Sequence, residues 1–216
     1  MARKVCEMST WKDLQPKLVA ILRGVTPDEI IPIAEGLIGE GFRALEIPLN
    51  SPDPFTSIER LVRFSEGLEC LIGAGTVLTP QDVRRVCDVG GSLVVAPNCN
   101  GEVIKESVAL GMTTVPGVFT ATEALAALSW GAHALKFFPA SLLGAAGIKA
   151  ISAVLPDGTD MIAVGGVSDK DIAGYRAAGI MGFGLGSSLY KPGDSVIDVI
   201  SRGRAAIAAY NSGGSQ

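Results

Sequence analysis

The sequence contains little of what metal sites need. It has a single histidine, His133, and four cysteines with no Cys-x-x-Cys pair. A metal site that uses two or more histidines therefore cannot be built from one chain, and the cysteine spacing does not match a zinc site. We expect no bound metal ion. The scattered cysteines also favour reduced thiols in a cytosolic setting.

The sequence also lacks an excess of basic residues and any long apolar run. Its 18 Lys and Arg residues against 22 Asp and Glu residues give a formal net charge of -4, so we expect no nucleic acid partner. No apolar run could span a bilayer and the first residues lack the apolar core of a signal peptide, so we expect no membrane partner and a cytoplasmic location. Local geometry rather than a broad positive field must hold any anionic ligand.

The sequence does have short apolar runs at fairly regular intervals along its 216 residues. Near-continuous apolar runs of this length are typical of parallel strands that are covered on both faces. Eight strands are predicted, at residues 18–24, 44–50, 71–77, 92–98, 113–119, 134–140, 161–167 and 182–189.

Helix-start signals lie between these runs. The segment TPDE predicts Thr26 as N-cap, Pro27 as the first helical residue and Glu29 as the capping partner. Similar signals occur at residues 79–82, 120–123 and 168–171. Eight alternating strand and helix signals predict a (β/α)8 barrel of the TIM type; the alternative, a doubly wound sheet, usually has fewer strands in this length.

The chain is predicted to form one domain. Residues 18–210 form the barrel. Residues 1–17 are predicted as a short helical segment that covers the floor of the barrel. The small, polar residues of the tail 211–216 predict a flexible end.

Barrels of this kind carry their chemistry at the C-terminal ends of the strands, so polar residues there are candidates. Lys136 lies in the middle of the apolar run ALKFFPA. A lysine buried without a partner is costly or loses its proton, and the neutral amine is a nucleophile toward a carbonyl group. The alternative is a structural ion pair with Glu46, the matching polar residue of ALEIPLN. The other lysines, Lys191 among them, fall in predicted helices, loops or termini and are interpreted as solvated.

Other residues at the strand ends predict an anion site. Arg23 ends the first strand and could bind a carboxylate with two hydrogen bonds, and Thr76 could add a hydroxyl group. Loops after strands seven and eight of such barrels often hold a phosphate group with backbone N–H groups. The candidates for phosphate binding are Gly165, Gly166, Gly186 and Ser187.

The motifs LEIPLN, GAGTVL, PGVFTATEA, LKFFPA and AVGGV resemble those of the 2-keto-3-deoxy-6-phosphogluconate/galactonate aldolases, from about Leu18 to Tyr210. The resemblance implies a class I aldolase without metal or cofactor, on a (β/α)8 barrel that assembles as a homotrimer. It implies that Lys136 forms the Schiff base and that Glu46 is the general acid and base. The substrate would be a phosphorylated 2-oxo acid that is cleaved to pyruvate and glyceraldehyde 3-phosphate.

Two branches of this family differ in the configuration of the substrate at C4. Gluconate-type members commonly read E-x-T-L-R-T and have threonine before the paired glycines, whereas this chain has Asn50 and Val164 at those positions. We therefore expect the galactonate substrate, with Asn50, Val164, Phe138 and Pro97 as specificity residues. The alternatives are the gluconate epimer, 4-hydroxy-2-oxoglutarate, and a barrel that binds a sugar phosphate without catalysis.

Overall fold

The structure is a computed structural model that describes residues 11–212. All strands are parallel and form one sheet in the order β5-β4-β3-β2-β1-β9-β8-β7-β6. The strands are β1 (Leu18–Ile21), β2 (Ala44–Pro48), β3 (Leu71–Gly75), β4 (Leu93–Val95), β5 (Thr113–Val115), β6 (Gly117–Val118), β7 (Leu135–Phe137), β8 (Met161–Val164) and β9 (Gly182–Leu185).

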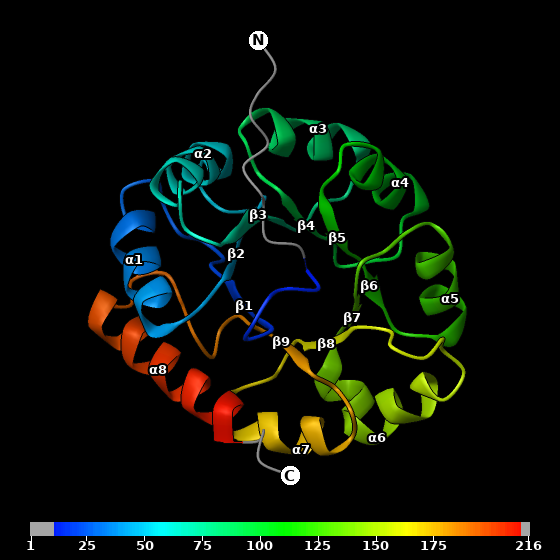
Figure 1. The fold of residues 1–216 in the computed structure, drawn as a ribbon. Helices are drawn as coiled ribbons and strands as arrows, with labels where there is room; N and C mark the ends of the chain where they lie inside the picture. The colour runs from blue at the N-terminus through cyan, green and yellow to red at the C-terminus, as the bar shows by residue number, and fades with distance from the viewer. Residues whose placement is uncertain (1–10, 213–216) are drawn as a thin grey trace.

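The first and last strands of this order, β5 and β6, follow each other directly in the chain, so the sheet closes into a barrel. Pro116 separates β5, which pairs with β4, from β6, which pairs with β7. The carbonyl oxygen of Pro116 still accepts a hydrogen bond from the backbone N–H of Lys136, at 2.9 Å. The nine short strands therefore correspond to the eight predicted ones, and the predicted barrel is confirmed (Figure 1).

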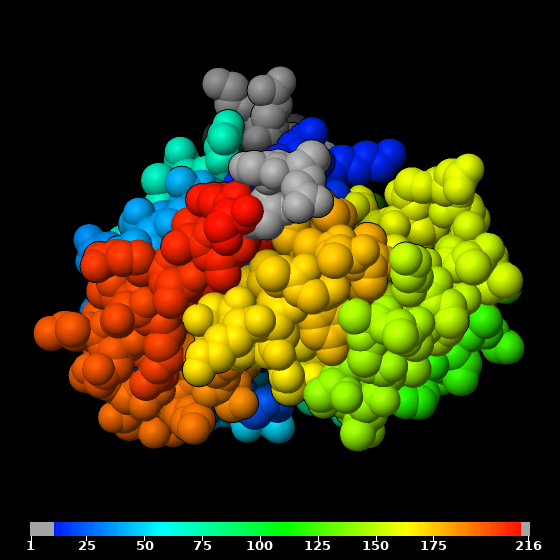
Figure 2. Space-filling view, turned by 90° about the horizontal axis from the view of Figure 1, so that it is seen from below, coloured from blue at the N-terminus to red at the C-terminus, as the bar shows by residue number. Residues whose placement is uncertain are grey.

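A ring of helices surrounds the barrel (Figure 1). The helices before the last one connect one strand to the next. The helices are α1 (Ile30–Glu40), α2 (Pro54–Phe64), α3 (Pro80–Asp88), α4 (Gly101–Ala109), α5 (Ala121–Ser129), α6 (Ala140–Ser152), α7 (Ile172–Ala177) and α8 (Val196–Ser212), with a 3-10 turn η1 at Asp169–Asp171. The last helix, α8 (orange to red), lies beside α7 and α1 and so completes the ring (Figures 1 and 2).

The predicted helix starts are present with one change. Thr79 and Thr120 are N-caps whose side chains accept hydrogen bonds from the N–H groups three residues later. In the first helix, the backbone N–H of Thr26 donates to Glu29 Oε2 at 3.0 Å, as predicted. However, α1 begins only at Ile30, because residues 27–29 form a turn, so the prediction that Pro27 is helical was wrong.

Two apolar layers hold the fold together. One fills the inside of the barrel and includes Val19, Leu71 and Leu93; the other lies between the strands and the helices. Trp11 and Leu14 belong to the inner layer and are almost fully buried. Residues 11–17 form turns and a bend rather than the predicted helix, whereas residues 1–10 and 213–216 lie outside the described residues.

Candidate active site

A cavity of about 470 Å³ opens where the C-terminal ends of the strands meet. Eleven of the twelve predicted site residues line it, although they come from most of the length of the chain. These are Arg23, Glu46, Thr76, Pro97, Lys136, Phe138, Val164, Gly165, Gly166, Gly186 and Ser187. The twelfth, Asn50, lies beside it, and its side-chain oxygen accepts a hydrogen bond from Arg23 Nη1 at 2.5 Å.

Lys136 is held in the wall of the cavity by the middle of β7. Only 5% of its surface is exposed, and its ammonium nitrogen lies 4.9 Å from the centre of the Phe138 ring. Burial lowers the pKa of Lys136, and the positive charge of Arg23 adds to this effect, while the carboxylate of Glu46 opposes it. A lowered pKa increases the fraction of neutral amine, which is the nucleophilic form.

Glu46 lies in β2 and reaches the same cavity. It is 1% exposed, and its Oε2 atom has no hydrogen-bond partner among the described residues. Burial raises the pKa of Glu46 to about 7, although Lys136 and Arg23 pull it down. A carboxyl group with such a pKa can both give and take a proton near neutral pH.

Lys136 and Glu46 are close in the fold but are not in direct ionic contact. Within residues 11–212, no ion pair as close as 4.0 Å joins Lys136 to Glu46. The two groups therefore influence each other across the cavity without neutralising each other in direct contact. Both side chains line the same cavity, so both are open to a ligand that binds there.

Gly75, at the end of β3, was missed in the sequence, where it is part of GAGTV. A Cβ atom at this position would lie 1.8 Å from Glu46 Oε2 and 2.4 Å from Oε1. The carboxyl group of Glu46 thus occupies the space that any other residue at 75 would need. The sequence signal that could have revealed this position is the pair of glycines just before Thr76 in GAGTV.

Arg23 and Thr76 form the second polar cluster. Arg23 Nη2 donates to Thr76 Oγ1 at 3.3 Å, while Nη1 is held by Asn50. Thr76 has a φ of +55°, a left-handed conformation that is uncommon for a β-branched residue. The guanidinium group is exposed toward the cavity, where its remaining N–H groups can bind a carboxylate.

The part of the cavity wall that follows β8 is built from backbone. Gly165 and Gly166 have φ values of +92° and +72°. A Cβ atom at Gly165 would lie 3.0 Å from the Phe138 ring, and one at Gly166 would lie 2.6 Å from Ser141 Oγ. Only glycine allows this close approach of the chain. The loop after β9 contributes three further lining residues that sequence reasoning did not select, Tyr190, Lys191 and Pro192.

No group of three or more His, Cys, Asp or Glu residues that could hold a metal ion occurs in the part of the chain that the structure describes. His133 lies outside the cavity, and its Nδ1 accepts a hydrogen bond from the backbone N–H of Thr114. Within residues 11–212 no helix is both long and apolar enough to cross a membrane.

A buried lysine with a lowered pKa and a buried carboxyl group in the mouth of a (β/α)8 barrel are the features of a class I aldolase. A family model described as KDPG and KHG aldolase matches residues 12–200. The chain belongs to this family.

Similar proteins cover nearly the whole chain. The chain is 56% identical over 205 residues to the "Probable 2-dehydro-3-deoxy-6-phosphogalactonate aldolase" of Rhizobium meliloti strain 1021, covering 94% of this chain and 96% of the relative. It is 48% identical over 200 residues to the 2-dehydro-3-deoxy-6-phosphogalactonate aldolase of Escherichia coli K12, covering 93% and 97%. A solved structure described as native KDPGal superimposes with a TM-score of 0.91 at 46% identity, covering 93% and 97%.

The contact between Gly75 and Glu46 makes a prediction for Gly75→Ala. The added methyl group forces the Glu46 carboxyl group to move, and misplacing a reacting group by about 1 Å can cost about 100-fold in rate. We expect kcat to fall by about this factor while the thermal midpoint changes little, because a side chain rather than backbone must shift.

The matched control is Gly39→Ala in α1, where a Cβ atom would have no heavy atom within 4 Å. Steady-state kinetics and thermal unfolding of both variants make the comparison. Full activity of Gly75→Ala would contradict the placement of Glu46 described above.

Proposed function

We propose that this protein is a class I aldolase that cleaves 2-dehydro-3-deoxy-6-phosphogalactonate to pyruvate and glyceraldehyde 3-phosphate. The observation that carries the proposal is the buried Lys136 amine, which faces Glu46 across a cavity lined with groups for two anions. The two galactonate-named relatives and their coverage of the whole chain support the choice of substrate.

The reaction would begin at the C2 ketone of the substrate. The neutral amine of Lys136 adds to C2, and loss of water from the resulting carbinolamine gives a protonated imine. The low polarity of the site favours the neutral amine before the attack, because burial lowers the pKa of Lys136. The cation formed on the lysine nitrogen then accepts electrons from the bond that breaks.

Glu46 would move the protons. As a carboxylate it takes the proton of the C4 hydroxyl group, so that C4 becomes an aldehyde carbon and the C3–C4 bond breaks. The electron pair of that bond moves into the imine and gives an enamine. Protonation of C3 and addition of water then release pyruvate and restore the amine. A group that takes and returns protons works best with a pKa near the working pH, and burial raises the pKa of Glu46 to about 7.

The two ends of the substrate would be held in different ways. Arg23, supported by Asn50 and Thr76, faces the cavity with N–H groups for the carboxylate of the pyruvate portion. After β8 and β9, Gly165 and Gly166 would present backbone N–H groups to the phosphate, together with Gly186 and Ser187. This fixes the direction in which the substrate lies over Lys136.

The residues near C4 support the galactonate epimer. Val164 is buried at the end of β8 and offers no hydroxyl group to the substrate. Asn50 holds Arg23 rather than providing a guanidinium group of its own. A hydroxyl group of the wrong configuration would then lie against an apolar wall without a partner, which is unfavourable. Phe138 and Pro97 would complete the walls of this part of the cavity.

We also propose that the protein is a cytoplasmic homotrimer, as the family resemblance implies. Leu142, Val154 and Ile197 are large apolar side chains that are 76%, 59% and 79% exposed on the described chain, and subunit contacts would bury such surface.

The substrate is tested by comparing the two C4 epimers under identical conditions. We expect kcat/KM for the galactonate-derived substrate to exceed that for the gluconate-derived one by at least about tenfold. This is the loss of rate expected when one buried polar group has no hydrogen-bond partner. Pyruvate release measures both reactions, and 4-hydroxy-2-oxoglutarate serves as a third substrate.

A preference for the gluconate epimer or for 4-hydroxy-2-oxoglutarate would overturn the assigned substrate while leaving the imine chemistry in place. Thermal stabilisation by the phosphorylated compounds without pyruvate release would instead favour a barrel that only binds sugar phosphates.

The role of Glu46 predicts a pH dependence. The base form is present above its pKa, so kcat/KM for cleavage should fall as the pH drops through about 7, the value to which burial raises the pKa of Glu46. Glu46→Gln should reduce kcat by about 100-fold or more and remove this acidic limb of the pH profile.

The control is Glu102→Gln, at an exposed position in the first turn of α4. It should keep both the rate and the profile. An unchanged acidic limb in Glu46→Gln would show that another group is the base.

A further inference from the structure

Lys191 lines the same cavity as the paired glycines, and β9, which precedes its loop, pairs with β8, which precedes the glycines. It lines the cavity together with Gly186 and Ser187, which precede it in the loop between β9 and α8. The residue is exposed, and its ammonium group forms no ion pair within 4.0 Å among residues 11–212. The sequence suggested only a solvated lysine of a loop, but the fold places this lysine at the rim of a ligand cavity.

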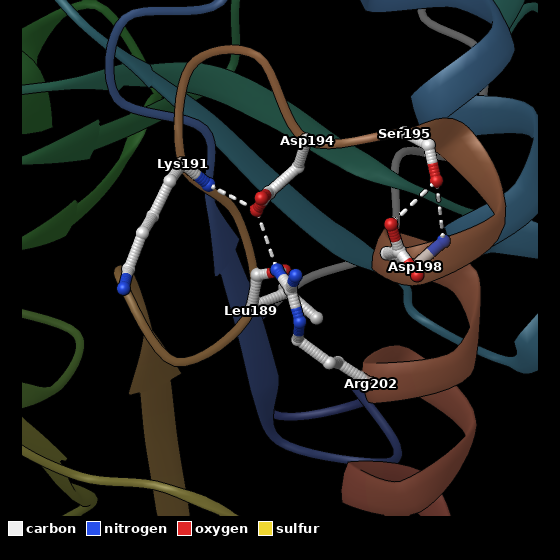
Figure 3. Close-up of polar contacts among 6 residues, drawn as sticks. All are labelled: Leu189, Lys191, Asp194, Ser195, Asp198 and Arg202. Atoms are coloured by element: carbon white, nitrogen blue, oxygen red, sulfur yellow. Dashed lines mark hydrogen bonds and ion pairs between the residues drawn. The ribbon is translucent and has the colours of Figure 1, made fainter.

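The backbone that carries Lys191 is fixed at several points (Figure 3). Its N–H group donates to Asp194 Oδ2 at 2.8 Å. Arg202 of α8 donates to the same carboxylate at 2.5 Å and to the carbonyl oxygen of Leu189 at 2.9 Å. One guanidinium group thus joins the loop to α8 at two points, Leu189 and Asp194. The Lys191 side chain points away from Asp194 (Figure 3).

The loop is also packed against the segment that follows Arg23. Pro192 lies so close to Gly24 that a Cβ atom on Gly24 would be 2.6 Å from Pro192 Cγ. The side chain of Tyr190 is 98% removed from solvent, since its exposed fraction is 2%. Lys191 therefore projects as an exposed side chain from an anchored backbone between two packed residues.

The charges around the loop favour an anion next to Lys191. Asp194 is the acidic residue of the loop, and its carboxylate is engaged mainly by Arg202, whose hydrogen bond lowers the pKa of Asp194; the charge of Lys191 adds to this as the smallest of the contributions and without an ion pair. The cavity itself is lined by three basic residues, Arg23, Lys136 and Lys191, and by one acidic residue, Glu46. Since Arg23 and Lys136 lie toward the carboxylate and ketone of the proposed substrate, Lys191 is the cation left for the phosphate.

We propose that Lys191 binds the phosphate group of the substrate and so determines the preference for phosphorylated over unphosphorylated substrates. This inference rests on the proposed aldolase function. The backbone N–H groups of the glycine loops give the phosphate its position, and the lysine adds a positive charge that uncharged amides cannot supply. In a protein with a net charge of -4, this local charge offsets the general repulsion of a dianion.

The test uses the synthetic direction, with pyruvate and either D-glyceraldehyde 3-phosphate or D-glyceraldehyde. Lys191→Gln removes the charge and retains much of the length of the side chain. We expect KM for the phosphorylated aldehyde to rise about tenfold, with little change for the unphosphorylated one, because a charge-assisted contact is lost. The difference from the wild type should shrink at high salt, where the Debye length falls to about 3 Å.

Two variants control this result. Lys191→Arg keeps the charge and should restore most of the affinity, and Lys149→Gln changes an exposed lysine of α6 that does not line the cavity. Lys149→Gln should behave as the wild type. An equal KM for the phosphorylated aldehyde in the wild type and Lys191→Gln would overturn the proposal.

Exchange of the pyruvate methyl protons in D2O separates this inference from the proposed function. The exchange needs the imine and enamine but no phosphate, so it should be the same in Lys191→Gln and in the wild type. Slower exchange in Lys191→Gln would overturn a role confined to the phosphate. Absence of exchange in the wild type would instead refute the aldolase chemistry itself.

Discussion

The central constraint on this site is that two ionisable groups are buried inside one barrel. Lys136 and Glu46 are 5% and 1% exposed, and burial shifts their pKa values in opposite directions, toward the neutral forms. Placing either charge alone in such a site would be unfavourable by several kcal/mol. The two strands β7 and β2 hold the groups close enough to influence each other's pKa without a direct ion pair, which is the arrangement that the proposed roles of nucleophile and proton carrier require.

The remaining parts of the site follow from this constraint. Gly75 leaves the space that the Glu46 carboxyl group occupies, and the closure of the sheet at Pro116 fixes the backbone of Lys136. Arg23 supplies a cation at the end of β1. At the ends of β8 and β9, glycines bring backbone close to the cavity, and the loop carrying Lys191 is tied down by Arg202. The proposed substrate has an anionic group at each end, and this lining offers groups for both.

Much of this arrangement could be predicted from the sequence, because it depends on local patterns. A lysine within an apolar strand is conspicuous, and strand runs followed by capping signals such as TPQD gave the correct order of elements. Features that depend on contacts between distant segments of the chain were missed. The clash that excludes a side chain at Gly75 comes from another strand, and Lys191 looks like any loop lysine until the fold brings its loop to the cavity. The start of α1 was misplaced because the Thr26–Glu29 pair closes a turn before the helix begins.

Borohydride reduction in the presence of pyruvate, followed by mass mapping of the peptides, tests the central claim most directly. If Lys136 is the nucleophile, reduction leaves an irreversible pyruvate adduct on the peptide that contains it. The adduct should be absent without the reductant and absent in Lys136→Ala. No adduct, or an adduct on another lysine such as Lys149, would contradict the assignment of Lys136 as the imine-forming residue.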